Sequence, residues 1–268
     1  MDLAAFLSAV LLGIVEGFTE FLPISSTGHL ILLGEAIGFQ GPPGKSFEIS
    51  IQLGAVLAVV WLFRDTLLRI AFGMWRRGST EYHFALNLLL AFLPAMVLGA
   101  LFYGPITRFL YTPAVVAWAL ILGGIVIIVI EKLRPPPTIH SVPEMSPKAA
   151  LLVGFGQALA MIPGTSRSGA TIMGALGLGV DRKTAAEFSF FLAVPTMLAA
   201  SAYDLYKNAG DLGSDGWYAI AIGFVVSFVV ALLVIRWFLG IVTRHGFTPF
   251  AWYRIIAGGI AIVWLSLG

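Results

Sequence analysis

The chain has 268 residues, of which 59% are hydrophobic and only 11% are charged, and its mean hydropathy is +0.93. A chain of this composition would not stay dissolved in water, and apolar stretches of roughly 18 or more residues span a bilayer. The net charge of +2 is too small to indicate a nucleic-acid partner, and the absence of cysteine excludes disulfides, thiolate nucleophiles and cysteine metal sites. We therefore predict an all-α polytopic membrane protein without a nucleic-acid partner.

The first segment is apolar over residues 1–22, although it contains Glu16 and Glu20, and a polar run follows at 23–29. The next apolar piece, residues 30–37, is only about two helical turns long. Neither arm is a comfortable membrane span, so we predict a re-entrant pair: one helix enters, a polar loop lies at depth, and a second helix leaves. Irregular backbone at that depth is tolerated only where protein or a water-filled cavity surrounds it.

Apolar stretches of spanning length follow in two groups, with one more re-entrant pair between them. A basic segment with apolar positions typical of an interfacial helix occupies residues 64–83. The second re-entrant pair is predicted at 149–162 and 172–180, around a polar loop at 163–171. The six predicted spans lie at about 47–63, 84–103, 113–130, 186–206, 217–239 and 250–267.

The order of elements repeats along the chain. A shift of 140 residues places Pro23 on Pro163 and Ser26 on Ser166. We predict a single integral membrane domain, residues 1–268, made of repeat one (1–131), a polar, proline-rich linker (132–148) and repeat two (149–268). Each half would contain one re-entrant helix pair and three transmembrane helices. Because three is odd, the second half would be inserted upside down, which gives an inverted-topology repeat.

The distribution of basic residues supports this topology. On the predicted arrangement, one side of the membrane receives eleven basic residues and the other side receives three. Such an asymmetry is what the positive-inside rule expects. It places both termini outside, and inverted repeats of this kind hold their site near the bilayer midplane. The eleven are Arg64, Arg69, Arg76, Arg77, Lys132, Arg134, Lys148, Arg182, Lys183, Arg236 and Arg244, and the three are Lys45, Arg108 and Lys207.

The loop at residues 163–171 places Arg167 among the hydroxyl groups of Ser166, Ser168 and Thr171. An arginine at membrane depth is costly unless it meets an anion, so intramembrane charges are interpreted as functional by default. The guanidinium offers a planar fork of donors for phosphate oxygens, and a helix that starts in the loop adds its positive end. We predict a phosphate-binding site here. The alternative is a polar turn whose arginine reaches the lipid headgroups.

Glu16 and Glu20 are four residues apart, so both carboxylates lie on one face of a helix. Like charges at membrane depth repel unless a cation or a shared proton intervenes. A divalent cation (Mg²⁺ or Ca²⁺) held by both carboxylates and by substrate phosphate oxygens would remove that repulsion. The alternative is a carboxylate pair hydrated in the outer interface.

The polar run before the second apolar piece contains Ser25, Ser26, Thr27 and His29. A histidine beside serines and near two carboxylates is the set of groups that general acid–base or nucleophilic phosphoryl transfer needs. We assign Ser26 and His29, with Glu20 and Arg167, to catalysis, and Ser25 and Thr27 to phosphate binding. A structural, hydrogen-bonded histidine is the alternative, and the attacking group, serine or water, stays open.

These motifs together resemble the bacitracin-resistance family of undecaprenyl-diphosphate phosphatases, over nearly the whole chain. The resemblance implies hydrolysis of the terminal phosphate of a C55 polyprenyl diphosphate at the outer face of a bacterial inner membrane, dependent on a divalent cation. That reaction recycles the lipid carrier of peptidoglycan synthesis and confers bacitracin resistance. It also implies that the site consists of Glu16, Glu20, Ser26, His29, Ser166, Arg167 and Thr171.

A second function from another class stays open, since inverted repeats with broken helices at the midplane are also a transporter layout. A polyprenyl-phosphate transporter or flippase would share this sequence pattern. The paired carboxylates and the arginine loop favour catalysis, because transport needs no metal site opposite a phosphate cradle. The expected partners are the lipid substrate and the membrane, and a homodimer is left open.

Overall fold

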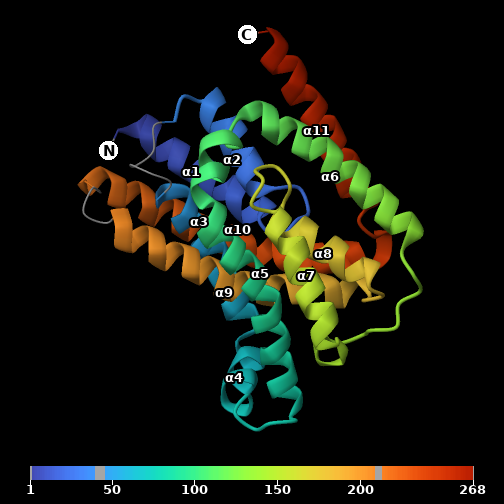
Figure 1. Ribbon diagram of the computed structural model, residues 1–268. Coiled ribbons are helices and arrows are strands. Elements are labelled where there is room, and N and C mark those ends of the chain that lie inside the picture. Colours follow the sequence, from blue (N-terminus) through green and yellow to red (C-terminus); the bar gives the residue numbers. More distant parts are fainter. Residues whose placement is uncertain (1, 40–45, 209–212, 268) are drawn as a thin grey trace.

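The computed structural model describes residues 2–39, 46–208 and 213–267, so Lys45 of the charge argument lies outside the described residues. Within these ranges the chain is helical, with one 3-10 turn at Val142–Glu144 and one isolated β-bridge between Ile139 and Val180 (Figure 1). The helices are α1 (Leu3–Thr19), α2 (Ser26–Ala36), α3 (Ser46–Leu62), α4 (Arg64–Gly73), α5 (Thr80–Phe109), α6 (Pro113–Leu133), α7 (Pro147–Leu159), α8 (Arg167–Gly177), α9 (Arg182–Asn208), α10 (Ser214–His245) and α11 (Thr248–Leu267).

Local signals set several of the helix starts. The side chains of Ser79, Thr112 and Ser146 each accept a hydrogen bond from the backbone N–H three residues later, at the starts of α5, α6 and α7. Proline occupies the first position of α6 and of α7, where its missing N–H costs nothing. These caps explain why α5 begins before the predicted apolar span, since Ser79 starts the helix in the polar segment.

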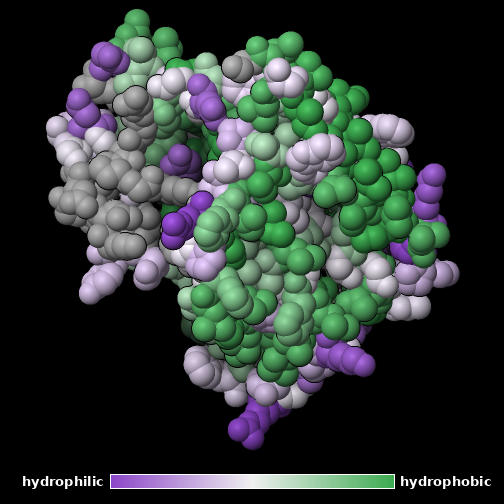
Figure 2. Space-filling model, turned by 45° about the horizontal axis from the view of Figure 1, so that its top comes forward, coloured by the Kyte–Doolittle hydropathy of each residue, from purple (hydrophilic) through white to green (hydrophobic). Residues whose placement is uncertain are grey.

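Five of the described helices are long and apolar enough to cross a membrane, namely α5, α6, α9, α10 and α11. The predicted span at 47–63 corresponds to α3, which reaches spanning length only when it is counted together with α4. The two members of that pair meet at 79°, so α4 turns away from the span as the interfacial helix at residues 64–83 was expected to do. Hydrophobic side chains cover much of the surface, with hydrophilic groups gathered mainly toward its edges (Figure 2). The prediction of an all-α polytopic membrane protein is confirmed.

The two short helix pairs, α1 with α2 and α7 with α8, occur where re-entrant pairs were predicted. Each pair packs against a long helix of the other half of the chain: α1 lies along α10, and α7 lies along α5. Two related halves would produce such a reciprocal arrangement, in which the first helix of each half packs on a long helix of the other half. The repeat boundaries and the opposite insertion of the halves stay predictions.

Glycines allow these helices to approach closely. A Cβ atom added at Gly13 would lie 2.7 Å from the carbonyl oxygen of Gly223, and one added at Gly17 would lie 2.5 Å from that of Ser227. Small residues at such crossings are the usual means of packing helices in membranes, where no hydrophobic force draws them together. The close packing of α1 on α10 holds the first polar loop in place.

The linker is fixed to the helices by polar contacts. Asn87 of α5 is buried and donates to the carbonyl oxygens of Val142 (3.2 Å) and Met145 (2.8 Å). Nearby, Glu131 at the end of α6 accepts from Arg182 at 2.8 and 3.2 Å, and also from the backbone N–H of Phe247. This carboxylate joins α6 to the starts of α9 and α11, at the end of the molecule remote from both chain termini (Figure 1).

Candidate active site

Both polar loops end in the same unusual helix cap. Ser25 and Ser166 have φ angles of 71° and 75°, a region that residues other than glycine rarely adopt. Each serine side chain accepts from the N–H three residues later, that of Gly28 or of Gly169. The equivalent residues of the two loops are therefore 141 apart in the structure, instead of the 140 expected from the sequence. Backbone strain of this kind is concentrated at functional sites.

The two loops touch each other. A Cβ atom added at Gly28 would lie 3.5 Å from the Cα of Gly164, and the Ser168 hydroxyl donates to the carbonyl oxygen of Leu22 at 2.8 Å. The starts of α2 and α8 are thereby brought together. The first N–H groups of a helix have no carbonyl partner within it, and the aligned peptide dipoles leave that end positive. Two such ends at one place favour an anion.

Glu20, Ser26 and Arg167 form a connected group at this junction. Arg167 donates from Nη2 to Glu20 Oε1 at 2.8 Å, and Ser26 donates its hydroxyl to Glu20 Oε2. The side chain of Glu20 is 6% exposed and that of Arg167 is 10% exposed. Residues from both halves, 147 positions apart, therefore share one buried ion pair.

The hydroxyl groups around Arg167 are engaged with the protein. Ser189 on α9 accepts from Arg167 Nη1 through its carbonyl oxygen at 2.7 Å, and Thr171 donates to the Ser189 hydroxyl at 2.7 Å. Ser166 caps α8, and Ser168 binds the first loop as described above. Ser166, Ser168 and Thr171 therefore shape the loop and support the arginine, whereas phosphate binding by their side chains stays a prediction.

His29 lies beside this group but is turned toward α11. Its Nδ1 is 2.7 Å from the carbonyl oxygen of Ser25, and its Nε2 is 2.7 Å from the hydroxyl of Tyr253, on which the imidazole stacks. Because a carbonyl oxygen only accepts, Nδ1 carries the proton and Nε2 accepts from the tyrosine. The Ser26 hydroxyl donates to Glu20 and not to His29. The assignment of Ser26 and His29 to catalysis stays a prediction. Thr27 accepts a long, 3.4 Å bond from Gln52.

The carboxylate of Glu16 fits a cation. Glu16 is 0% exposed, and neither of its oxygens has a hydrogen-bond partner among the described residues. Glu20 follows one turn later, and its N–H donates to the carbonyl oxygen of Glu16. A buried carboxylate without a partner is costly, which a bound cation would relieve. The described residues contain no cluster of three or more metal-ligating side chains, so a cation here would take its other ligands from phosphate or water.

Arg254 of α11 was missed by the sequence interpretation. It is 1% exposed, and its guanidinium donates only to backbone carbonyl oxygens, at 2.9–3.2 Å. Those acceptors belong to the first loop, the second loop and α6, so one side chain joins all three. Arg254 lies inside a predicted span, and the rule that singled out Arg167 would have identified it. The acceptors are Pro23, Gly164, Thr165, Ala119 and Leu120.

Comparison with known proteins identifies the family of this chain. A sequence model described as "Bacitracin resistance protein BacA" matches residues 9–260. The undecaprenyl-diphosphatase of Rhizorhabdus wittichii is 60% identical over 262 residues, which are 97% of this chain and 98% of that protein. Undecaprenyl-diphosphatase 2 of Paramagnetospirillum magneticum is 56% identical and covers 96% of this chain and 98% of its own length. The undecaprenyl-diphosphatase of Sphingopyxis alaskensis is 53% identical, with 96% and 97% covered. With a match that spans nearly its whole length, this chain belongs to the bacitracin resistance protein BacA family.

Proposed function

We propose that this protein is an integral membrane phosphatase that hydrolyses undecaprenyl diphosphate to undecaprenyl phosphate and inorganic phosphate. Its relatives carry the name undecaprenyl-diphosphatase at 50–60% identity over nearly the full chain. The single observation that carries the proposal is the buried group in which Glu20 accepts from both Ser26 and Arg167. A nucleophile, a base and a cationic phosphate ligand are the parts that phosphoryl transfer needs.

In the proposed reaction, Glu20 takes the proton from the hydroxyl of Ser26, and the serine oxygen attacks the terminal phosphorus. The bond from that phosphorus to the bridging oxygen breaks, and undecaprenyl phosphate leaves. Water then attacks the phosphorus of the phosphoserine, and the bond from phosphorus to the serine oxygen breaks. The serine oxygen takes back the proton held by Glu20, and phosphate is released with the oxygen of the water. Direct attack by a water molecule that Glu20 deprotonates is the alternative that the sequence left open, and a trapped phosphoserine distinguishes the two routes.

Arg167 and the starts of α2 and α8 would stabilise the negative charge that spreads over the phosphate oxygens during transfer. Arg167 Nε is buried without a hydrogen-bond partner among the described residues, so the guanidinium retains a donor for a phosphate oxygen. His29 would act as a positioning residue, since Nδ1 binds the Ser25 carbonyl and holds the strained cap before Ser26.

Glu16 and Glu20 would hold a divalent cation, Mg²⁺ or Ca²⁺. Bound there, the cation would neutralise charge on the two phosphates. The unpartnered oxygens of Glu16 support this assignment.

We infer that the protein resides in the inner membrane of a bacterium, with both termini and the site opening on the periplasmic side. The eleven-to-three distribution of basic residues supports this orientation. The prenyl chain would extend sideways into the lipid, and the two phosphates would face the loops. This arrangement accounts for a polar site at membrane depth.

The transporter alternative shares the layout but leaves the Ser26–Glu20 contact without a role. Phosphate release from detergent-solubilised protein separates the two functions, because hydrolysis needs no sealed compartment. We expect release by the wild type, and losses of about 10²-fold or more for Glu20→Gln and Ser26→Ala. Glu35→Gln, which changes an exposed carboxylate on α2, is the matched control and should be as active as the wild type. Full activity of Glu20→Gln would refute the assignment.

A further inference from the structure

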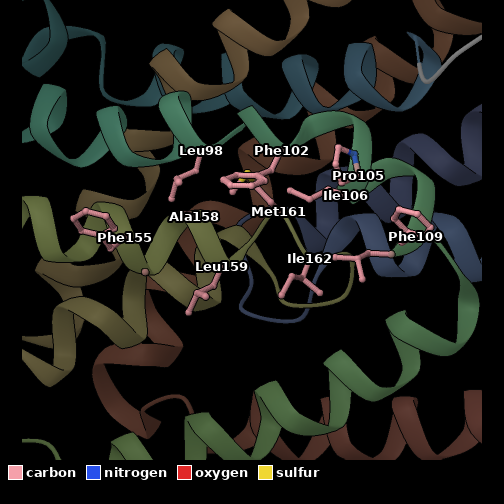
Figure 3. A pocket seen from close by; sticks show the side chains of 12 residues that line it. Leu98, Phe102, Pro105, Ile106, Phe109, Phe155, Ala158, Leu159, Met161 and Ile162 are labelled. Atoms are coloured by element: carbon pink, nitrogen blue, oxygen red, sulfur yellow. The ribbon is translucent and has the colours of Figure 1, made fainter. Parts of the chain in front are cut away.

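An apolar groove of about 850 Å³ lies between the C-terminal halves of α5 and α7. This volume falls within the range of roughly 300–1,000 Å³ that small-ligand sites occupy. Figure 3 shows the side chains of both helices around it. The groove has an aromatic character, and its lining includes Leu98, Phe102 and Phe109 of α5 and Phe155, Leu159 and Ile162 on the side of α7.

Glycine and proline positions explain why α5 and α7 diverge at the groove. A Cβ atom added at Gly154 of α7 would lie 2.5 Å from the carbonyl oxygen of Ala91, so α7 and α5 are in close contact there. Pro94 follows Ala91 within α5, and Pro105 lies farther along the same helix. A proline inside a helix removes a hydrogen bond and bends the axis. One turn beyond Gly154, Ala158 already lines the groove.

The corresponding crossing in the first half stays closed. There α1 meets α10 at Gly13, and one turn later Gly17 still contacts Ser227. Phe18 packs against Trp237 of α10 just beyond this contact, with ring centroids 5.9 Å apart and the ring planes tilted by 40°. Gly17 is the residue 141 positions before Ala158, the same offset as between the two serine caps. The crossing of α1 and α10 is therefore filled by the Gly17 contact and the aromatic pair, whereas the groove occupies the corresponding place between α7 and α5.

The groove runs up to the phosphate-binding loop. Met161 and Ile162 line it, and the chain continues from them through Pro163 into Gly164, which touches the first loop. A ligand whose diphosphate lies at the starts of α2 and α8 would therefore have its hydrocarbon part beside Ile162. We infer that the groove binds the isoprene units that follow the first one in the prenyl chain of the substrate, and this inference rests on the proposed function.

The prenyl chain is favoured over a bilayer acyl chain because Ile162, which lines the groove, lies two residues before Gly164, which touches the first polar loop. An apolar groove next to an anion-binding site suits a ligand that has both a hydrocarbon chain and a diphosphate. The three phenylalanine side chains give the groove a rigid lining, which suits a stiff, branched hydrocarbon. A groove filled only by bilayer lipid is an outcome that the experiment below distinguishes.

The test fills the groove and compares two soluble diphosphates. Leu98→Trp and Ala158→Leu enlarge side chains that line it, and Leu233→Trp places the same ring on an exposed position of α10 (71% exposed) as the control. We expect kcat/KM for farnesyl diphosphate to fall about tenfold or more, which is about 1.4 kcal/mol, in both groove variants. For isopentenyl diphosphate, whose chain ends near the site, the groove variants should match the control.

An equal loss on both substrates, or no loss on either, would overturn the inference, because the chain would then lie elsewhere or the variants would have disturbed the whole site. A wild type that does not hydrolyse undecaprenyl diphosphate would contradict the proposed function instead. A photoreactive farnesyl diphosphate analogue provides a readout without turnover. It should label peptides containing Phe102 and Leu159, and unlabelled farnesyl diphosphate should compete. Labelling that does not respond to the competitor would show a bilayer lipid site and refute the assignment.

Discussion

Replacement of Arg254 by methionine tests whether one buried guanidinium holds the two polar loops together. The side chain reaches Pro23 in the first loop and both Gly164 and Thr165 in the second. Methionine has a similar length and no donor, so all of these bonds disappear and the carbonyl oxygens remain buried. A hydrogen bond to a charged group contributes about 1.5–3 kcal/mol net, and a buried acceptor left alone costs about 1–3 kcal/mol.

These contributions are not additive, because the loops can relax and water can enter. We expect the free energy of unfolding to fall by about 4 kcal/mol, at the upper end of single-residue effects. For a chain of this size, about 1 kcal/mol shifts Tm by about 2–4 °C, so the expected drop is about 8–16 °C. Thermal unfolding of purified protein in detergent measures the shift in Tm. Phosphate release measures the loss of activity that we expect when the two loops are no longer held together.

A second variant approaches the same contact from the other side. A Cβ atom at Gly123 of α6 would overlap the guanidinium of Arg254, whereas one at Gly259 of α11 would meet nothing within 4 Å. Gly123→Ala should therefore reproduce part of the loss in Tm and activity, and Gly259→Ala should leave both unchanged. An Arg254→Met protein with wild-type Tm and wild-type activity would refute the idea that this residue organises the site.

Three further predictions use other contacts. Tyr253→Phe removes the donor to His29 Nε2, and we expect kcat/KM to fall by about threefold to tenfold. A single hydrogen bond contributes about 0.5–1.5 kcal/mol, so the Tm shift should stay under about 6 °C, and a larger Tm loss would indicate a structural role instead. Gly17→Ala should lower Tm by several degrees in thermal unfolding because its methyl group meets α10, whereas Gly34→Ala meets nothing and should not; equal Tm values would contradict the close packing. Glu131→Gln leaves the charge of Arg182 uncompensated, so we expect the free energy of unfolding in a denaturant titration to fall by about 2–4 kcal/mol. An unchanged free energy of unfolding would refute the stabilising role of Glu131 between α6, α9 and α11.

The sequence alone was sufficient to predict the class of protein and the approximate positions of its helices. Long apolar stretches, proline and glycine interruptions and hydroxyl caps act over short distances, so they can be interpreted without knowledge of the fold. The two short helix pairs, α1 with α2 and α7 with α8, and the separate helix α4 lie where such signals predicted them. Glu20 and Arg167 were also singled out in this way, because a charge at membrane depth is costly wherever it lies.

Which partner each of these residues meets was decided by tertiary structure alone. Spacing along the chain placed Ser26 near His29, but the rotation of α2 turns the serine toward Glu20 and the imidazole toward Tyr253. The role of Arg254 likewise depends on α11 lying against both loops, a contact between segments as many as 231 residues apart. Hydropathy and caps determine where helices form, whereas side-chain partners depend on how helices from distant parts of the chain face one another in space.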